Sequence, residues 1–210
     1  MANSARKVMI NNRMSIDFGF PQENLEESKA DKEKISAFID HLNKTLDFVL
    51  IVEMFDESLV YLRRMLNWTT KDIIYVKKNS KPWLQREKVP RFVHRDKYPE
   101  STHFLVNIFQ SVDVALYRHF RDLFEKRLRS ESQNFHLEVA EFRTVNKMAA
   151  DYCRSVRDVQ DFNVKSLTIP AGNLTSEVTV SKLDCHLITI SEEDLTKKAQ
   201  DYQKLKLLLQ

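Results

Sequence analysis

The sequence predicts an α/β fold with few strands and several long helices. Two short apolar runs, residues 48–52 and 73–76, are rich in β-branched and aromatic side chains, as buried strands are. The first run changes within a few residues to the apolar spacing of a helix, and later segments keep that helical period over longer stretches. A buried strand that leads into a helix is a building unit of α/β sheets.

The amino-terminal third alternates irregular and regular segments. Residues 1–28 have no sustained period and contain the turn-rich sequence Asp-Phe-Gly-Phe-Pro, so we expect an irregular lead-in. Residues 31–46 repeat apolar side chains at helical spacing and carry charge on the opposite face, which predicts an amphipathic helix. The strand at 48–52 follows, and a helix over 56–66 comes next because Leu59, Leu62 and Leu66 share one face.

The middle of the chain combines a turn, a short strand and a long loop. Residues 69–72 have the spacing of a helix cap, but the residues that follow are too few and too β-branched for a helix. We therefore expect a turn and then the strand at 73–76. Residues 77–99 are polar and basic, and Pro82, Pro90 and Pro99 interrupt regular structure, which predicts a long loop.

The remainder is predicted to be mainly helical. Apolar side chains recur every three or four residues over 102–127, as in a long and mostly buried helix. A further helix carries the apolar residues from Phe135 to Cys153, and a last one begins at the cap residue Ser191. Residues 159–190 alternate only weakly, so we expect irregular structure with possible short strands.

Length and composition limit the classes of function. A chain of 210 residues with 42% hydrophobic residues is long enough for one domain with a core. The net charge of +3 is too small to argue for nucleic acid or for an anionic membrane. The only glycines, Gly19 and Gly172, do not form a phosphate-binding loop. The sequence also lacks a long apolar stretch and a secretory signal, so we expect no membrane contact from these residues.

An acidic cluster lies where the first strand meets its helix. It consists of Glu53, Asp56, Glu57 and Ser58. Ligands of open α/β sheets gather where strands end and helices begin, so these side chains are candidates to accept hydrogen bonds from sugar hydroxyls. The alternative is an acidic cap, because a helix amino terminus favours negative charge. A phosphate is not expected there, since carboxylates already occupy the place of an anion.

A basic segment follows the second predicted strand. Residues 71–97 contain nine basic and three acidic residues, a net charge of +6. The segment is either a solvated loop or an anion site, and Trp83 within it either stacks on a ligand or anchors the loop. The histidines have no spacing typical of zinc ligands, and we expect no metal site.

Four segments resemble the galactose 3-O-sulfotransferase family. Residues 51–64 match, in register, a motif of the form (Val/Ile)-x-Glu-x-Phe-Asp-Glu-Ser-Leu-Val-x-Leu-(Arg/Lys)-Arg. Residues 12–19 (Asn-Arg-Met-Ser-Ile-Asp-Phe-Gly) resemble the family's Asn-x-(Met/Leu)-x-Phe-Asp-(Phe/Leu)-Gly segment, and residues 75–80 resemble a strand followed by Lys-x-Asn. Residues 112–120 are similar to its Leu-Asp-x-x-Leu-Tyr-x-His-Phe helix. The similarity is loose beyond residue 129.

The resemblance implies sulfuryl transfer from 3′-phosphoadenosine 5′-phosphosulfate to the 3-hydroxyl of galactose on a glycolipid or glycan, on the lumenal side of the Golgi membrane. It implies the carboxyl-terminal part of a P-loop-like fold, with a lead-in at 1–28, a family-like core at 29–130 and a helical extension at 131–210. Lys77, Lys78 and Lys81 become candidates to hold the donor phosphates. The family's Lys-Thr-Gly-Ser donor loop and its Arg-Asp-Pro segment do not occur in these residues.

A transfer to a hydroxyl needs donors around the sulfuryl oxygens, and that loop would supply them. We therefore expect no turnover by this chain alone, whether it is part of a longer enzyme or a shortened relative. The alternative function is a non-catalytic interaction or regulatory protein of the secretory pathway.

The cysteines and the glycosylation sequons bear on the compartment. Asn43, Asn67 and Asn173 each begin an Asn-x-Thr sequon, and three sequons lean toward a secretory compartment. Cys153 and Cys185 are too far apart for a Cys-x-x-Cys site and are either a disulfide or two inert thiols. The lumenal location implied by the resemblance, together with the sequons, favours the disulfide slightly.

Overall fold

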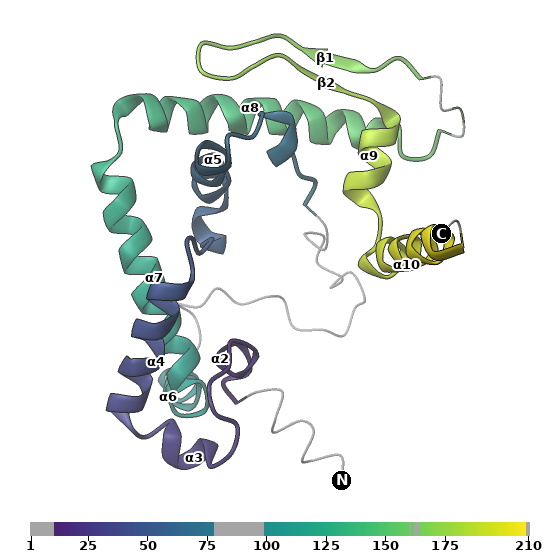
Figure 1. Ribbon diagram of the computed structural model, residues 1–210. Coiled ribbons are helices and arrows are strands. Elements are labelled where there is room, and N and C mark those ends of the chain that lie inside the picture. The colour runs from purple at the N-terminus through teal and green to yellow at the C-terminus, as the bar shows by residue number, and fades with distance from the viewer. Residues whose placement is uncertain (1–10, 78–98, 160, 162–163, 209–210) are drawn as a thin grey trace. The chain divides into compact units, whose positions relative to one another are not determined.

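The structure is a computed structural model that describes residues 11–77, 99–159, 161 and 164–208 (Figure 1). These residues are mostly helical and include one small sheet, so the α/β expectation holds only in part. The chain divides into two compact units, which are described separately. The first comprises Met1–Phe55 and Leu84–Glu131, and the second comprises Asp56–Trp83 and Ser132–Gln210.

The first unit is built from helices packed around α7. Its apolar core includes Ile39 and Leu42 from α4, which lie inside together with Val112, Leu116 and Phe120 from α7. The helices are α2 (Arg13–Asp17), α3 (Leu25–Ser28), α4 (Lys32–Thr45), α6 (Glu100–Phe109) and α7 (Ser111–Ser130). The prediction of a helix over 31–46 is confirmed by α4.

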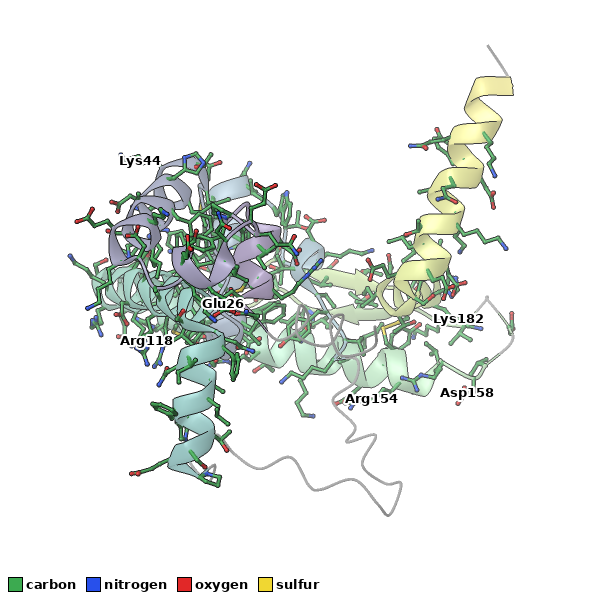
Figure 2. All side chains as sticks on the ribbon, turned by 90° about the horizontal axis from the view of Figure 1, so that it is seen from below. Glu26, Lys44, Arg118, Arg154, Asp158 and Lys182 are labelled. Carbon is green, nitrogen blue, oxygen red and sulfur yellow. A yellow bond between two sulfur atoms is a disulfide. The ribbon has the colours of Figure 1, made fainter. Side chains whose placement is uncertain are left out.

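The lead-in is more ordered than the sequence predicted, because α2 and α3 are short helices. Polar contacts hold both of them. The Asn11 side-chain amide donates to Glu26 Oε1 over 3.1 Å, and Lys29 Nζ lies 2.7 Å from Glu26 Oε2. Glu26 is labelled in Figure 2. Helices of four or five residues are too short to show a hydrophobic period, so no periodic pattern predicts them.

The prediction of one continuous helix over 102–127 was wrong. The helix is interrupted at Gln110, which has φ −123° and ψ 33°, and α7 begins at the next residue. The side-chain oxygen of Asn12 accepts hydrogen bonds from the backbone N–H groups of Val112 (2.9 Å) and Asp113 (3.1 Å). A residue about a hundred positions away therefore caps the new helix, which the local period could not reveal.

The cap is reciprocal. Asp113 Oδ1 accepts from the backbone N–H of Ser15 (2.7 Å), and Asp113 Oδ2 accepts from that of Met14 (3.2 Å). Each helix start thus supplies the side chain that satisfies the free N–H groups of the other. Two of the segments that carry the family resemblance are joined by these contacts.

We expect Asn12→Gly to lower the free energy of unfolding of the first unit by about 2 kcal/mol, because it leaves two backbone N–H groups at a buried helix start without an acceptor. Glycine tolerates the left-handed backbone of Asn12 (φ 54°), so the substitution removes the cap without adding strain. Urea unfolding measures the change.

Asn24→Gly is the matched control for the cap. Asn24 has nearly the same backbone conformation (φ 56°), is exposed, and makes no capping hydrogen bond with its side chain. Its replacement is expected to change the unfolding free energy by a few tenths of a kcal/mol. An equal loss in both variants would show that backbone conformation, and not the cap, accounts for the effect.

The predicted strand at 48–52 is not a strand. Among the described residues this segment pairs with no other strand. Its last residue begins a 3₁₀ turn, η1 (Val52–Met54). Its apolar residues instead pack onto helices: Ile51 is 4% exposed, and the Phe48 ring meets the Phe124 ring of α7 edge to face at 5.6 Å. Burial against a helix selects the same residue types as a buried strand does.

The described residues of the second unit form α8, a hairpin and further helices. The hairpin runs along α8, as Figure 1 shows, and its strands pair antiparallel, with Thr168 opposite Thr179. The prediction of helices over 56–66 and from Phe135 to Cys153 is confirmed. The elements are α5 (Phe55–Leu66), η2 (Lys71–Ile73), α8 (Gln133–Ser155), β1 (Leu167–Ile169), β2 (Val178–Val180), α9 (Lys182–Thr189) and α10 (Glu192–Leu208).

The predicted strand at 73–76 is also wrong. Its first residue closes η2, and Ile74 enters the core that lies between α8 and the hairpin. The backbone N–H of Tyr75 donates to Asn146 Oδ1 of α8 over 2.9 Å. A side chain of a helix therefore takes the place of a partner strand.

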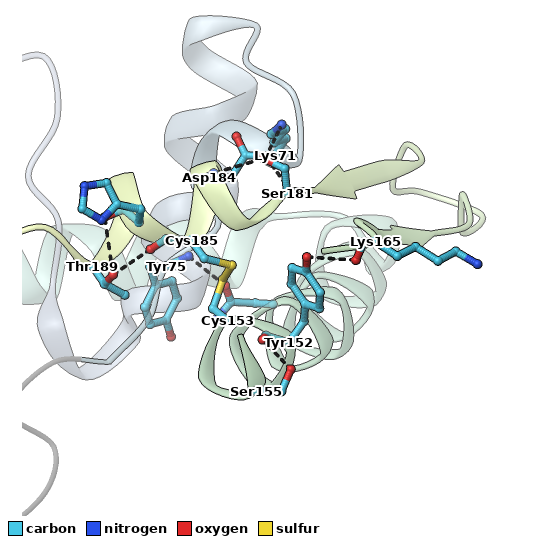
Figure 3. The surroundings of a disulfide bond; sticks show 12 residues. Lys71, Tyr75, Tyr152, Cys153, Ser155, Lys165, Ser181, Asp184, Cys185 and Thr189 are labelled. Atoms are coloured by element: carbon cyan, nitrogen blue, oxygen red, sulfur yellow. Dashed lines mark hydrogen bonds and ion pairs between the residues drawn. A yellow bond between two sulfur atoms is a disulfide. The ribbon is translucent and has the colours of Figure 1, made fainter. Parts of the chain in front are cut away.

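Cys153 of α8 and Cys185 of α9 form a disulfide, with their Cα atoms 5.1 Å apart (Figure 3). This is the pairing that the sequence slightly favoured. The helix α9 itself was not predicted. Its start carries a capping box in which Ser181 and Asp184 each bond the other's backbone N–H, and Lys71 Nζ lies 3.0 Å from Asp184.

No helix in the described part of the chain combines the length and apolarity needed to cross a membrane.

Candidate functional site

The four residues of the predicted acidic cluster lie in different surroundings. Asp56 and Glu57 lie in the first turn of α5, and Arg143 of α8 contacts both: its Nε lies 2.9 Å from Asp56 Oδ2 and its Nη2 lies 2.6 Å from Glu57 Oε1. The Tyr75 hydroxyl donates to the other oxygen of Asp56 over 2.8 Å. These carboxylates are thus already engaged within the second unit.

The electrostatics of this cluster agree with a tightly bonded arrangement. Burial and the hydrogen bond to Asp56 raise the pKa of Tyr75 to about 12, so its hydroxyl keeps its proton at neutral pH. The hydrogen bond to Asp56 and the charge of Glu57 raise the pKa of Arg143. Ser58, the next residue of the predicted cluster, is fully buried and faces the protein interior. A sugar at Asp56 would have to share the carboxylate with Arg143 and Tyr75.

Glu53 differs from its neighbours. It lies in η1, in the first unit, and is exposed. Within the described residues its carboxylate has no hydrogen-bond partner. Of the three predicted carboxylates, Glu53 is therefore the one whose oxygens are available to a ligand.

Glu53 lines an apolar pocket of about 230 Å³ in the first unit. The wall comes from α2, α4, α7 and the extended segment before η1. Glu53 is the only charged residue among the described residues that line it. The lining residues are Met14, Phe18, Leu42, Leu46, Val49, Leu50, Ile51, Val52, Glu53, Leu116, Tyr117 and Phe120.

Three of the family-like segments meet at this pocket. Met14 and Phe18 belong to the segment 12–19, Ile51 and Glu53 to the segment 51–64, and Tyr117 to the segment 112–120. They are separated by up to about a hundred residues in sequence. The pocket is therefore the place where residues that carry the resemblance form a common concave surface, as binding sites do.

Glu53 lies within electrostatic reach of Arg121 on α7. The pKa of Arg121 is raised mainly by its hydrogen bond to Glu125, with Nε and Oε1 2.8 Å apart, then by the charge of Glu125 and in smaller part by the charge of Glu53. Sequence reasoning missed Arg121 and Tyr117, although Tyr117 belongs to a quoted family-like segment.

Only one of the three lysines predicted to hold the donor phosphates lies in the described part of the chain. Lys77 is exposed, whereas Lys78 and Lys81 lie outside the described residues, as does Trp83. Among the described residues, no three His, Cys, Asp or Glu side chains are grouped so as to hold a metal ion. The role of the three lysines stays a prediction.

The three sequon asparagines are all exposed. Asn43 lies on α4, Asn67 follows α5 with a left-handed backbone (φ 52°), and Asn173 lies in the turn between β1 and β2. Their accessibility is compatible with glycosylation, which stays a prediction.

Comparisons with known proteins agree on one family. A sequence model of the family described as galactose-3-O-sulfotransferase matches residues 1–164. Mouse galactosylceramide sulfotransferase is 31% identical over 121 residues, which are 57% of this chain and 26% of that protein. Mouse galactose-3-O-sulfotransferase 2 is 29% identical over 167 residues (79% and 38%), and its human counterpart is 32% identical over 151 residues (70% and 34%). The chain thus spans between 26% and 38% of the length of these relatives. No solved structure matches the chain.

Proposed function

The chain belongs to the galactose-3-O-sulfotransferase family, and from that membership we propose that it forms the acceptor-binding part of an enzyme that sulfates galactose. The proposed reaction transfers the sulfuryl group of 3′-phosphoadenosine 5′-phosphosulfate to the 3-hydroxyl of galactose on a glycolipid or glycan. The relatives' names specify galactosylceramide in one case and galactose in others.

The observation that supports this proposal best is the pocket where three family-like segments meet around Glu53. A carboxylate accepts hydrogen bonds from sugar hydroxyls, and Tyr117 contributes an aromatic ring to the same wall. We assign Glu53 the role of orienting the acceptor galactose. Asp56 and Glu57 have a supporting role in this proposal, because Arg143 already engages both carboxylates.

The donor supplies the sulfuryl group when it is bound. In the proposal, Lys77, Lys78 and Lys81 contribute positive charge toward its phosphates. The reaction is placed on the lumenal side of the Golgi membrane, where the exposed sequons would also be used.

We expect Glu53→Gln to weaken binding of methyl β-galactoside about tenfold. The change keeps the size of the side chain and removes the charge, and a hydrogen bond to a charged group contributes more than one to a neutral group. Titration followed by NMR measures the affinity. Glu33→Gln is the control, because Glu33 is exposed on α4 and does not line the pocket. Equal affinities of both variants and the unchanged chain would contradict the role of Glu53.

Transfer itself is testable in a chimera. The 121 matching residues of mouse galactosylceramide sulfotransferase would be replaced by the corresponding residues of this chain, and radiolabelled donor would report turnover. We expect sulfation of galactosides that Glu53→Gln reduces and Glu33→Gln does not. A folded chimera that binds galactosides without turnover would instead favour the non-catalytic interaction protein.

A further inference from the structure

A pocket of the second unit lies where α8 ends beside α9. Its volume is about 380 Å³, and none of its lining residues belongs to the acidic cluster or to the four family-like segments. The lining residues are Cys153, Val156, Arg157, Val159, Lys182, Cys185, His186 and Thr189. The site around Glu53 therefore does not account for this pocket.

Basic side chains line the pocket, and among the described residues no acidic one does. Arg157 follows the carboxyl end of α8, while Lys182 and His186 belong to α9. The Nζ atom of Lys198 on α10 lies 3.4 Å from His186 Nε2, which brings a fourth basic group to the same wall. A concave surface lined by charge of one sign favours a ligand of the opposite sign, here an anion.

Two of these basic groups differ in how they are held. Lys182 is 8% exposed, and its ammonium group donates to the backbone carbonyl oxygens of Val159 and, over 2.9 Å, of Asp161. Its position is thus fixed before a ligand arrives. Arg157 is exposed, and within the described residues its guanidinium has no hydrogen-bond or ion-pair partner. A guanidinium offers planar pairs of N–H donors that match two oxygens of a phosphate or sulfate group.

The inner wall of the pocket is apolar. Cys153 and Cys185 are each 4% exposed and Val156 is 5% exposed. Figure 3 shows the disulfide that joins the two cysteines, and the Thr189 hydroxyl donates to the Cys185 carbonyl oxygen over 2.7 Å. A bare phosphate or sulfate ion is much smaller than this pocket and would leave the apolar wall uncovered.

We propose that this pocket binds a small organic molecule that carries a phosphate or sulfate group. The oxyanion lies at Arg157 and Lys182, and the organic part packs against Val156 and the disulfide. The inference is independent of the proposed function, because it concerns a separate pocket of the second unit and gives no role to galactose or to the sulfuryl donor. The alternative is that the basic residues only balance the carboxyl ends of α8 and α9.

Phenyl phosphate and phenyl sulfate are suitable probes, because each joins an oxyanion to a small apolar ring. Phenol lacks the charge, and inorganic phosphate lacks the ring. We expect phenyl phosphate to bind the 210-residue chain at least tenfold more tightly than either of these, since charge-assisted hydrogen bonds and apolar burial both contribute. The tighter of the two phenyl esters identifies the preferred oxyanion.

Histidine ring signals in NMR spectra report where the probe binds. The His186 signal, assigned by its loss in His186→Gln, should shift on titration with phenyl phosphate. The signal of His136 should stay unchanged, because His136 is an exposed residue of α8 that does not line the pocket. A shift of both signals to the same extent would indicate binding all over the basic surface and would overturn the pocket.

A substitution at the exposed guanidinium tests the oxyanion contact. Arg157→Gln should weaken phenyl phosphate about tenfold, because it removes a charge-assisted contact. Arg154→Gln is the matched control: Arg154 is also exposed, lies three residues earlier, and pairs with Asp151 instead of lining the pocket. It should leave the affinity unchanged. A loss of stability in Arg157→Gln without a loss of affinity would show that Arg157 only balances the end of α8.

The remaining ligands separate this inference from its rivals. Equal affinity for phenol and phenyl phosphate would overturn the oxyanion site, and equal affinity for inorganic and phenyl phosphate would overturn the assignment to an organic ester. Adenosine 3′,5′-bisphosphate is titrated in parallel. A His186 shift at concentrations far below those needed for phenyl phosphate would make the pocket part of a donor site and would overturn its independence from the proposed function.

Discussion

Cys153→Ala/Cys185→Ala is expected to lower the free energy of unfolding of the second unit by about 3 to 4 kcal/mol. The disulfide closes a segment of 32 residues, and in the chain-entropy model a loop of this length contributes about that much. Both cysteines are 4% exposed and belong to the core between α8 and the hairpin. The bridge joins α9 to this core, so its loss should release α9 first.

Amide hydrogen exchange followed by mass spectrometry resolves the effect by segment. Protection of α9 should fall strongly, while α7, which belongs to the other unit, serves as the internal control. Reductant should weaken the unchanged protein to a similar extent and leave the double variant unaffected. That comparison separates the cross-link from the small cavities that alanine leaves. Recovery of both cysteines as alkylated free thiols from protein secreted by a eukaryotic host would contradict the pairing.

Elements with local signals could be predicted from the sequence. The helix expected over 31–46 agrees with α4 because its apolar period and its cap are both local: Asp31 accepts hydrogen bonds from the N–H groups of Glu33 and Lys34. The sequence around Ser181 has the spacing of a capping box, as Ser191 does, so the start of α9 also carries a local signal in the sequence.

Elements defined by distant partners could not be predicted. The interruption before α7 depends on Asn12, and the backbone N–H of Tyr75 is bound by the side chain of Asn146 of α8. Both predicted strands failed for the same reason. An apolar, β-branched run indicates burial, but it does not say whether a strand or a helix covers the segment.

The candidate site likewise contains residues that a local pattern indicates and residues that only the fold brings together. The sequence singled out Glu53, Asp56 and Glu57 together, because they are close along the chain. Only the fold shows that Arg143 engages the last two, and that Glu53 lies in a pocket with residues from two distant segments. The expectation that the cluster lies where a strand ends and a helix begins is wrong, since residues 48–52 form no strand and lead into η1.

A second large effect is expected at Glu138 of α8. Its side chain is 5% exposed and forms ion pairs with Arg63 and Arg64 of α5, with Arg64 Nε 2.8 Å from Glu138 Oε2. The Arg64 guanidinium also lies over the ring of Phe135, 5.0 Å from its centre. Arg63→Met/Arg64→Met would leave a buried carboxylate without a counter-charge. We expect a loss of about 3 kcal/mol in the free energy of unfolding of this unit.

Two further variants test whether burial of the Glu138 charge causes this loss of stability. One adds a third substitution to the double variant, and the other changes a matched group of ion pairs on the same helix. Adding Glu138→Met to the double variant should restore most of the lost free energy of unfolding. The loss comes from the unpaired buried charge of Glu138 and not from the missing ion pairs. Asp151, also on α8, pairs with Lys147 and Arg154 but is 46% exposed. Lys147→Met/Arg154→Met should therefore cost less than about 1 kcal/mol in urea unfolding. If both double variants lose the same amount, or if Glu138→Met restores nothing, burial of the Glu138 charge is not what makes the two arginines necessary.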